Sequence, residues 1–197
     1  MARHPRQEIL YNGCYAHVFS RALEKRRIFE AGNDFEYFKR LLGEAKQKSG
    51  LLIHHYCLMN THFHLAVSIP QVESFSRTLQ TLKSKYTAFF NRKYSHEGPL
   101  WRGRFKSLLI ENESYLYACG LYIEYNPVQA GITRQPTDWP YSSGACYELG
   151  KPDPLVDPYE GRELPANNSI LTEASFTRGR AIGSELFQMH LQEGVFQ

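Results

Sequence analysis

The fold is limited most by residues 51–69, which contain two β-rich runs separated only by Asn60 and Thr61. Two strands with so short a connection pair as an antiparallel hairpin, although the Asn-Gly dipeptide preferred in such turns is absent. In the second run, residues 62–69, the side chains alternate, so that they face opposite sides of a sheet. The side chains of the expected core face are Phe63, Leu65, Val67 and Ile69.

Further strands and helices are predicted on both sides of this hairpin. Residues 14–20 and 105–110 are β-rich, and residues 33–48 are expected to form a helix. Residues 71–92 carry apolar side chains at spacings of three and four, which is typical of a long amphipathic helix. These apolar positions are Phe75, Leu79, Leu82, Tyr86 and Phe89.

A last helix of this series is expected to begin near Asn112. Pro127 disfavours helical geometry at the residue before it, so we expect the helix to end at Asn126. The resulting order is strand, helix, strand, strand, helix, strand, helix. That order predicts an α+β sandwich, in which helices pack on an antiparallel sheet.

The character of the sequence changes near residue 150, where prolines become frequent. We therefore divide the chain into a main domain, residues 1–149, and an appendage, residues 150–197. The appendage is expected to be a linker followed by a short helix at 184–192, with Ser184 as its cap. It also carries Arg178 and Arg180, which are candidate contacts to an anionic partner.

The net charge of +3 is distributed unevenly. Residues 1–150 carry 19 Lys and Arg against 13 Asp and Glu, whereas residues 151–197 carry 4 against 7. The basic part is thus the candidate binder of a polyanion, although a surplus of this size also occurs on ordinary solvated surfaces. Neither a secretion signal nor a membrane span is recognisable, and the four cysteines form no C-x-x-C pair. We expect a cytoplasmic protein with no membrane partner.

Two histidines share one face of the predicted strand 62–69. His62 and His64 stand about 7 Å apart along a strand that rises ~3.3 Å per residue, opposite the apolar face. Side chains so placed can converge on one metal ion. An isolated His-x-His is also compatible with two exposed or hydrogen-bonded histidines, so a second signal is needed.

The helix before Pro127 supplies that signal. Tyr122 and Asn126 are four residues apart and lie on one helix face, at the edge of an apolar stripe. They are placed to face the sheet and its histidines. Tyr115, seven residues before Tyr122, is the rival tyrosine. The alternative is that Tyr122 is a core aromatic and Asn126 a helix cap.

These residues belong to a series of short motifs along the chain. The motifs are Met1-Ala2-Arg3, Ser20-Arg21, Leu58-Met59, His62-Phe63-His64, Trp101-Arg102-Gly103-Arg104-Phe105, Tyr122-Ile-Glu-Tyr-Asn-Pro-Val-Gln-Ala-Gly131 and Trp139-Pro-Tyr-Ser-Ser143. In this order they resemble the single-tyrosine HUH transposases, most of all the branch associated with repetitive extragenic palindromes. The resemblance covers about residues 1–147. One departure is Asn60-Thr61 before the first histidine, where relatives usually have Pro-Asn.

The resemblance implies a ferredoxin-like core of the HUH nuclease type and an enzyme that cleaves and transfers DNA strands. His62, His64 and Asn126 would hold a divalent metal, and Tyr122 would attack the DNA backbone and become linked to it covalently. Two imidazoles and an amide oxygen suit Mg²⁺ or Mn²⁺. Relatives occur as monomers and as homodimers, and both states stay open here.

The expected partner is single-stranded or hairpin DNA. Candidate contacts are Arg21, Lys25, Arg26, Arg27, Arg102, Arg104 and Lys106, with Trp101 and Phe105 available to stack on unpaired bases. Two alternatives remain from the sequence. One is a nucleic-acid-binding module of the same fold without catalysis, and the other is a small metal-dependent hydrolase.

Overall fold

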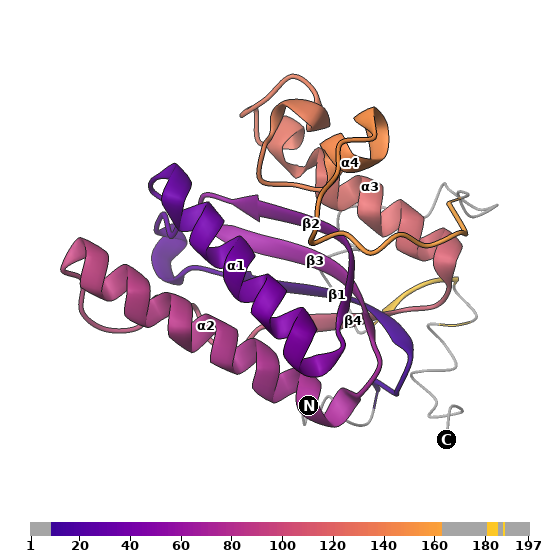
Figure 1. Ribbon diagram of the computed structural model, residues 1–197, viewed down its shortest axis with the longest axis horizontal. Helices are drawn as coiled ribbons and strands as arrows, with labels where there is room; N and C mark the ends of the chain where they lie inside the picture. The colour runs from indigo at the N-terminus through magenta and orange to yellow at the C-terminus, as the bar shows by residue number, and fades with distance from the viewer. Residues whose placement is uncertain (1–8, 163–180, 185–186, 188–197) are drawn as a thin grey trace.

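The computed structural model describes residues 9–162, 181–184 and 187, which form a twisted sheet with helices on both faces (Figure 1). The strands are β1 (Cys14–Arg21), β2 (Leu52–Met59), β3 (His62–Ile69), β4 (Lys106–Ile110) and β5 (Ala181–Ile182). Their spatial order is β2-β3-β1-β4-β5. The pairs among β1 to β4 are antiparallel, whereas β5 runs parallel to β4. The predicted hairpin and the ferredoxin-like α+β sandwich are confirmed.

Two helices, α1 (Gly32–Ser49) and α2 (Val72–Tyr94), pack against one face of the sheet (Figure 1). The core between them contains the predicted apolar side of β3 and most of the predicted stripe of α2. The buried side chains are Phe63, Leu65, Val67, Ile69, Phe75, Leu79, Leu82 and Tyr86. The alternation in β3 therefore predicted the correct core face.

The third helix, α3 (Glu113–Gln129), covers the opposite face of the sheet. It begins as predicted, since the Asn112 side chain accepts a hydrogen bond from the Tyr115 backbone N–H at 3.2 Å. Its predicted end at Asn126 is wrong, because the helix continues through Pro127. The carbonyl of Ile123, which would accept from the missing N–H of Pro127, instead accepts from the Asn126 side chain at 3.3 Å.

The helix ends at a glycine in the left-handed conformation. Gly131 has a φ of 67°, and its N–H donates to the Val128 carbonyl at 2.9 Å. The Ile132 N–H donates to the Pro127 carbonyl at 2.8 Å. These two bonds form a Schellman motif, which explains why the run from Asn126 to Gly131 closes the helix.

Segments that follow α3 pair with both edges of the sheet. The regular elements described in this part of the chain are the 3-10 helix η3 (Pro136–Asp138), the helix α4 (Gly144–Leu149) and β5. On β2, the Ser143 N–H donates to the Tyr56 carbonyl at 3.0 Å, and the Asp157 N–H donates to the Ile53 carbonyl at 2.7 Å. At the other edge, β5 pairs with β4. Within the described segments, none of the helices is long and apolar enough to span a membrane.

Part of the predicted appendage lies outside the described residues. Ser184 does accept a hydrogen bond from the Phe187 N–H at 3.2 Å, which is the geometry of a helix cap. Most of the expected helix at 184–192, together with Arg178, Arg180 and the Met1-Ala2-Arg3 motif, falls outside the described ranges.

Candidate active site

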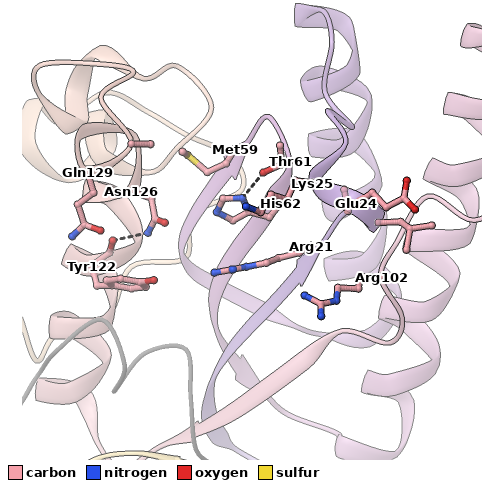
Figure 2. Close-up of a pocket in the computed structure, with 13 residues that line it drawn as sticks. Arg21, Glu24, Lys25, Met59, Thr61, His62, Arg102, Tyr122, Asn126 and Gln129 are labelled. Atoms are coloured by element: carbon pink, nitrogen blue, oxygen red, sulfur yellow. Dashed lines mark hydrogen bonds between the residues drawn. The ribbon is translucent and has the colours of Figure 1, made fainter.

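A pocket of about 760 Å³ opens where the end of β1, the turn between β2 and β3, and the last turns of α3 meet (Figure 2). It is lined by Arg21, Ala22, Leu23, Glu24, Lys25, Met59, Thr61, His62, Arg102, Tyr122, Asn126, Gln129 and Ala130. The pocket therefore joins part of the predicted catalytic set to part of the predicted DNA contacts.

The two histidines of β3 lie beneath α3, beside Tyr122. The ring centroids of His62 and His64 are 5.0 Å apart, and the ring of Tyr122 stands edge-on to His64 at 5.9 Å. His64 is fully buried, whereas His62 reaches the pocket wall. Strand alternation and helix packing thus bring together the residues that the sequence placed on two separate elements.

The surroundings keep both imidazoles neutral. Burial lowers the pKa of His62 to about 4; the cation of Arg21 also lowers it, whereas a hydrogen bond with Asn126 raises it. Burial holds the pKa of His64 well below its usual value, with further lowering by His17, His62 and Arg21. A neutral imidazole keeps the lone pair that a metal ligand must offer.

The ring nitrogens of the two histidines have different partners. Nδ1 of His62 lies 2.9 Å from Oγ1 of Thr61, and Nδ1 of His64 lies 2.8 Å from Nε2 of His17. Nε2 of His64 is buried and has no hydrogen-bond partner among the described residues. A buried polar atom left in this way costs about 1–3 kcal/mol, and a ligand bound to it would remove that cost.

The Asn126 side chain is oriented by the backbone of α3. Its amide nitrogen donates to the carbonyl of Tyr122 at 2.8 Å and to that of Ile123 at 3.3 Å. Because the nitrogen is used for the helix, the amide oxygen is the atom that is left to bond with His62 at the pocket. Within the described part of the chain, no three or more His, Cys, Asp or Glu side chains converge on one point. A metal site here would therefore depend on this oxygen.

Tyr122, and not Tyr115, lies at the pocket. Tyr122 lines its wall on the same helix as Asn126 (Figure 2). Both tyrosines belong to the apolar cluster under α3, where Tyr115 is 8% and Tyr122 is 9% exposed, but Tyr115 does not line the pocket. Burial raises the pKa of the Tyr115 hydroxyl. The geometry thus separates the two tyrosines that the helical period alone placed on one face.

Three of the predicted DNA contacts, Arg21, Lys25 and Arg102, line the pocket. The Arg102 N–H donates to the Arg21 carbonyl at 3.0 Å, which holds the two arginines on adjacent backbones. Glu24 and Lys25 have φ values of 52° and 56°, a conformation that residues other than glycine rarely adopt. Strain of this kind is often retained where a loop must present side chains to a ligand.

The other predicted contacts are arranged differently. Arg26, Arg27, Arg104 and Lys106 are exposed but do not line the pocket. The predicted stacking of Trp101 and Phe105 on bases does not fit the structure, because their side chains are 9% and 4% exposed and belong to the core. The Trp101 indole donates to Oγ1 of Thr87 at 3.1 Å, so its polar edge also faces protein.

Several residues of the site were missed in the sequence. Gln129 lies seven residues after Tyr122, and the helical period could have placed it on the same face. Thr61 could be suspected only from its position next to His62. His17 gave no signal, because its contact with His64 depends on the pairing of β1 with β3.

Comparisons with known proteins agree with this fold. Residues 10–126, more than half of the chain, match the family model described as "Transposase IS200 like". The fold is similar to that of a REP-associated tyrosine transposase bound to a REP hairpin, with a TM-score of 0.63 and 18% identity. That match covers 87% of this chain and 100% of the other. No curated protein matches the chain.

A second solved structure, described as that of a transposase from Deinococcus radiodurans R1, is less similar. Its TM-score is 0.43 at 15% identity, and the match covers 63% of this chain and 96% of the other.

Proposed function

The chain belongs to the IS200-like transposase family, and we propose that it cleaves and rejoins single-stranded or hairpin DNA through a covalent bond to Tyr122. One observation carries this proposal. Tyr122 forms the wall of the same pocket as His62, and the cations of Arg21 and Arg102 face that pocket (Figure 2). A nucleophile, a candidate metal site and phosphate-binding charge therefore occupy one place.

The candidate ligands fit Mg²⁺ or Mn²⁺. His62 and His64 offer neutral imidazoles, and Asn126 offers an amide oxygen, which together form a mixed nitrogen and oxygen set. The buried Nε2 of His64 supports the assignment, since a cation would satisfy it. When bound, the ion would polarise the scissile phosphate and offset charge on the leaving oxygen.

Tyr122 supplies the attacking oxygen in this proposal. As the phenolic oxygen bonds to phosphorus, the bond from phosphorus to a sugar oxygen breaks, and one DNA end becomes linked to the protein. The phenolic proton passes to a base or to water. Rejoining is the reverse reaction, in which a DNA hydroxyl displaces Tyr122. The number of phosphorus–oxygen bonds is conserved, so strand transfer requires no nucleotide cofactor.

The cations at the pocket bind the DNA backbone. Arg21, Lys25 and Arg102 would neutralise phosphates, so affinity should fall as the salt concentration rises. The preference for a single strand or a hairpin is supported by the similar structure, a tyrosine transposase bound to a REP hairpin. Equal or tighter binding to a blunt duplex of the same sequence would contradict this preference.

The decisive test replaces one hydroxyl. Tyr122→Phe keeps the ring and should abolish covalent attachment, while folding and DNA binding are retained. Each protein is mixed with Mn²⁺ and a labelled single strand and then denatured, and label that migrates with the protein is measured. Tyr115→Phe is the matched control and should still form the adduct.

The same assay separates the alternatives. Cleavage by the unmodified protein without attached label would indicate a hydrolase that uses water. Binding without cleavage would indicate a module that has no catalytic activity. An adduct that survives in Tyr122→Phe but disappears in Tyr115→Phe would show that the wrong tyrosine has been assigned.

A further inference from the structure

A second buried histidine stands behind the candidate ligand His64. His17 lies in the middle of β1, opposite Ala66 of β3, and is fully buried. Its Nε2 is 2.8 Å from Nδ1 of His64, and the two rings are nearly parallel, with an angle of 19° between their planes. Its ring also stands edge-on to Tyr122, with the centroids 6.2 Å apart. It thus adjoins both the candidate ligand and the candidate nucleophile.

A hydrogen bond between two neutral imidazoles requires one N–H and one lone pair. A neutral ring carries a single proton, so the nitrogen that binds a metal must be the unprotonated one. If Nε2 of His64 is the ligand, its proton lies on Nδ1, and that N–H can donate only if Nε2 of His17 offers a lone pair. In this arrangement the Nδ1–H of His64 donates a hydrogen bond to Nε2 of His17.

We propose that His17 is a positioning residue that holds His64 with its proton on Nδ1 and its Nε2 lone pair available to the metal. This inference rests on the metal site of the proposed function. Ligating histidines commonly use their second nitrogen in such a bond, which fixes the orientation of the ring and the position of its proton. Here the partner is another imidazole, and both rings are fully buried, so water cannot replace it without rearrangement.

Histidine variants test this role through metal affinity. His17→Phe keeps an aromatic ring but removes the acceptor, and we expect it to weaken Mn²⁺ binding by about 10- to 100-fold. His17→Gln can place an amide oxygen near the former Nε2 position and should restore most of the affinity. Binding is measured by titration calorimetry on the full chain without DNA, so the readout is independent of cleavage.

His54 provides the matched control. It is also a buried histidine of the sheet, but its ring nitrogens bond to Ser68 and to the backbone of Asp157. His54→Phe removes a comparable buried imidazole and should leave Mn²⁺ affinity unchanged. If His17→Phe binds Mn²⁺ as tightly as the unmodified protein, or if His54→Phe weakens binding equally, the role of His17 is refuted. If the unmodified protein binds neither Mn²⁺ nor Mg²⁺, the metal site itself is refuted, and this inference with it.

A measurement on the unmodified protein does not depend on how well the variants fold. With Mg²⁺ bound, nitrogen NMR of the imidazoles should show the His64 proton on Nδ1 and an unprotonated Nε2 on His17. A His64 proton on Nε2 in the Mg²⁺-bound protein would overturn the proposal, even if Mg²⁺ binding itself is demonstrated.

Discussion

The buried histidines of the sheet differ in how many of their nitrogens are satisfied. His54 uses both, since Nδ1 lies 2.7 Å from the Asp157 carbonyl and Nε2 lies 2.6 Å from Oγ of Ser68. His64 uses Nδ1 with His17, whereas its Nε2 has no hydrogen-bond partner among the residues described. The first pattern is typical of a structural histidine, and the second is compatible with the ligand role that we propose for His64.

The neutral state of His54 leads to a prediction about pH. Burial lowers the pKa of this imidazole, and the Asp157 carbonyl opposes the shift in part. Above the ordinary histidine pKa of about 6.5, the ring is neutral in both states. As the pH falls below that value, the unfolded chain takes up the proton first, so the free energy of unfolding decreases until the folded-state pKa is reached.

His54→Phe removes this titration. We expect its free energy of unfolding to fall less between pH 7.5 and pH 5 than that of the unmodified protein. The measurement is urea unfolding at both pH values on protein treated with a chelator, so that bound metal does not contribute. Equal decreases in the two proteins would show that His54 does not titrate differently on folding.

Sequence patterns identified the residues whose neighbours lie on the same element. His62 and His64 share a strand face, and Tyr122 and Asn126 share a helix face. His17 could not be found in this way, because its partner is set by the register between β1 and β3. Trp101 was assigned to DNA because Arg102 and Arg104 follow it, whereas its side chain is buried in the core.

At the level of elements, α3 is attached to β2 by a buried polar network. Glu124 of α3 pairs with Nδ1 of His55 at 2.8 Å and accepts from Oγ of Ser143 at 2.6 Å. Nε2 of His55 lies 2.8 Å from the hydroxyl of Tyr159. Glu124 is two residues from Tyr122, so the contacts that fix the helix lie beside the candidate nucleophile.

The close approach of α3 to β2 requires a glycine. A Cβ at Gly120 would overlap the ring of His55, which its polar partners hold in place. Gly120→Ala should therefore lower the free energy of unfolding by about 1–3 kcal/mol, as overpacking does, although alanine favours helix. Formation of the covalent adduct should also decrease, because any displacement of α3 moves Tyr122. Urea unfolding and the adduct assay measure the two effects.

Gly43 is the matched control in α1. A Cβ there would have its nearest contact at 3.9 Å, with Leu155, which is an ordinary van der Waals distance. Gly43→Ala should be neutral or stabilise the protein by up to about 1 kcal/mol, with unchanged adduct formation. If Gly43→Ala and Gly120→Ala changed the free energy of unfolding and adduct formation equally, the close contact between Gly120 and His55 would not be what limits this position.

The sequence predicted most elements but not how α3 ends. The alternation of β3 and the stripe of α2 arise from periodicity within one segment, so they are visible in the sequence. Continuation of α3 through Pro127 depends on the Asn126 side chain replacing the lost hydrogen bond. The expectation that a helix ends before proline considers the backbone alone, and it does not account for a side chain that replaces the missing N–H donor.

At the level of the whole molecule, the segment after residue 149 packs on the main domain. Leu155 is buried in the core, and Asp157 pairs with the edge strand β2 through its backbone. Its side chain also lies 2.7 Å from Nζ of Lys46. The frequent prolines led us to predict a linker here. The packing could not be predicted, because pairing with a strand about 100 residues earlier in the chain leaves no periodic pattern in the sequence. The division at residue 149 remains a prediction.

Coverage of the edges by the chain itself favours a monomer, a state that the sequence left open. Strands with unpaired edges promote association with other chains, and here β2 and β4 are both paired by later segments. We predict that the full chain elutes with the mass of one chain in size-exclusion chromatography with light scattering. A chain ended after Gly150 should melt at a lower temperature and self-associate, because β4 loses its pairing with β5 and β2 loses its pairing with Asp157.

Truncation both lowers stability and uncovers strand edges, and Leu155→Ala in the full chain separates these two effects. Removal of this buried side chain should cost about 2–5 kcal/mol of unfolding free energy, as for other buried leucines, but it leaves the backbone cover of β2 in place. The variant should therefore be less stable and still monomeric. Self-association of Leu155→Ala to the same degree as the truncated chain would attribute association to lost stability. A full chain that is already dimeric would contradict the role of the covered edges.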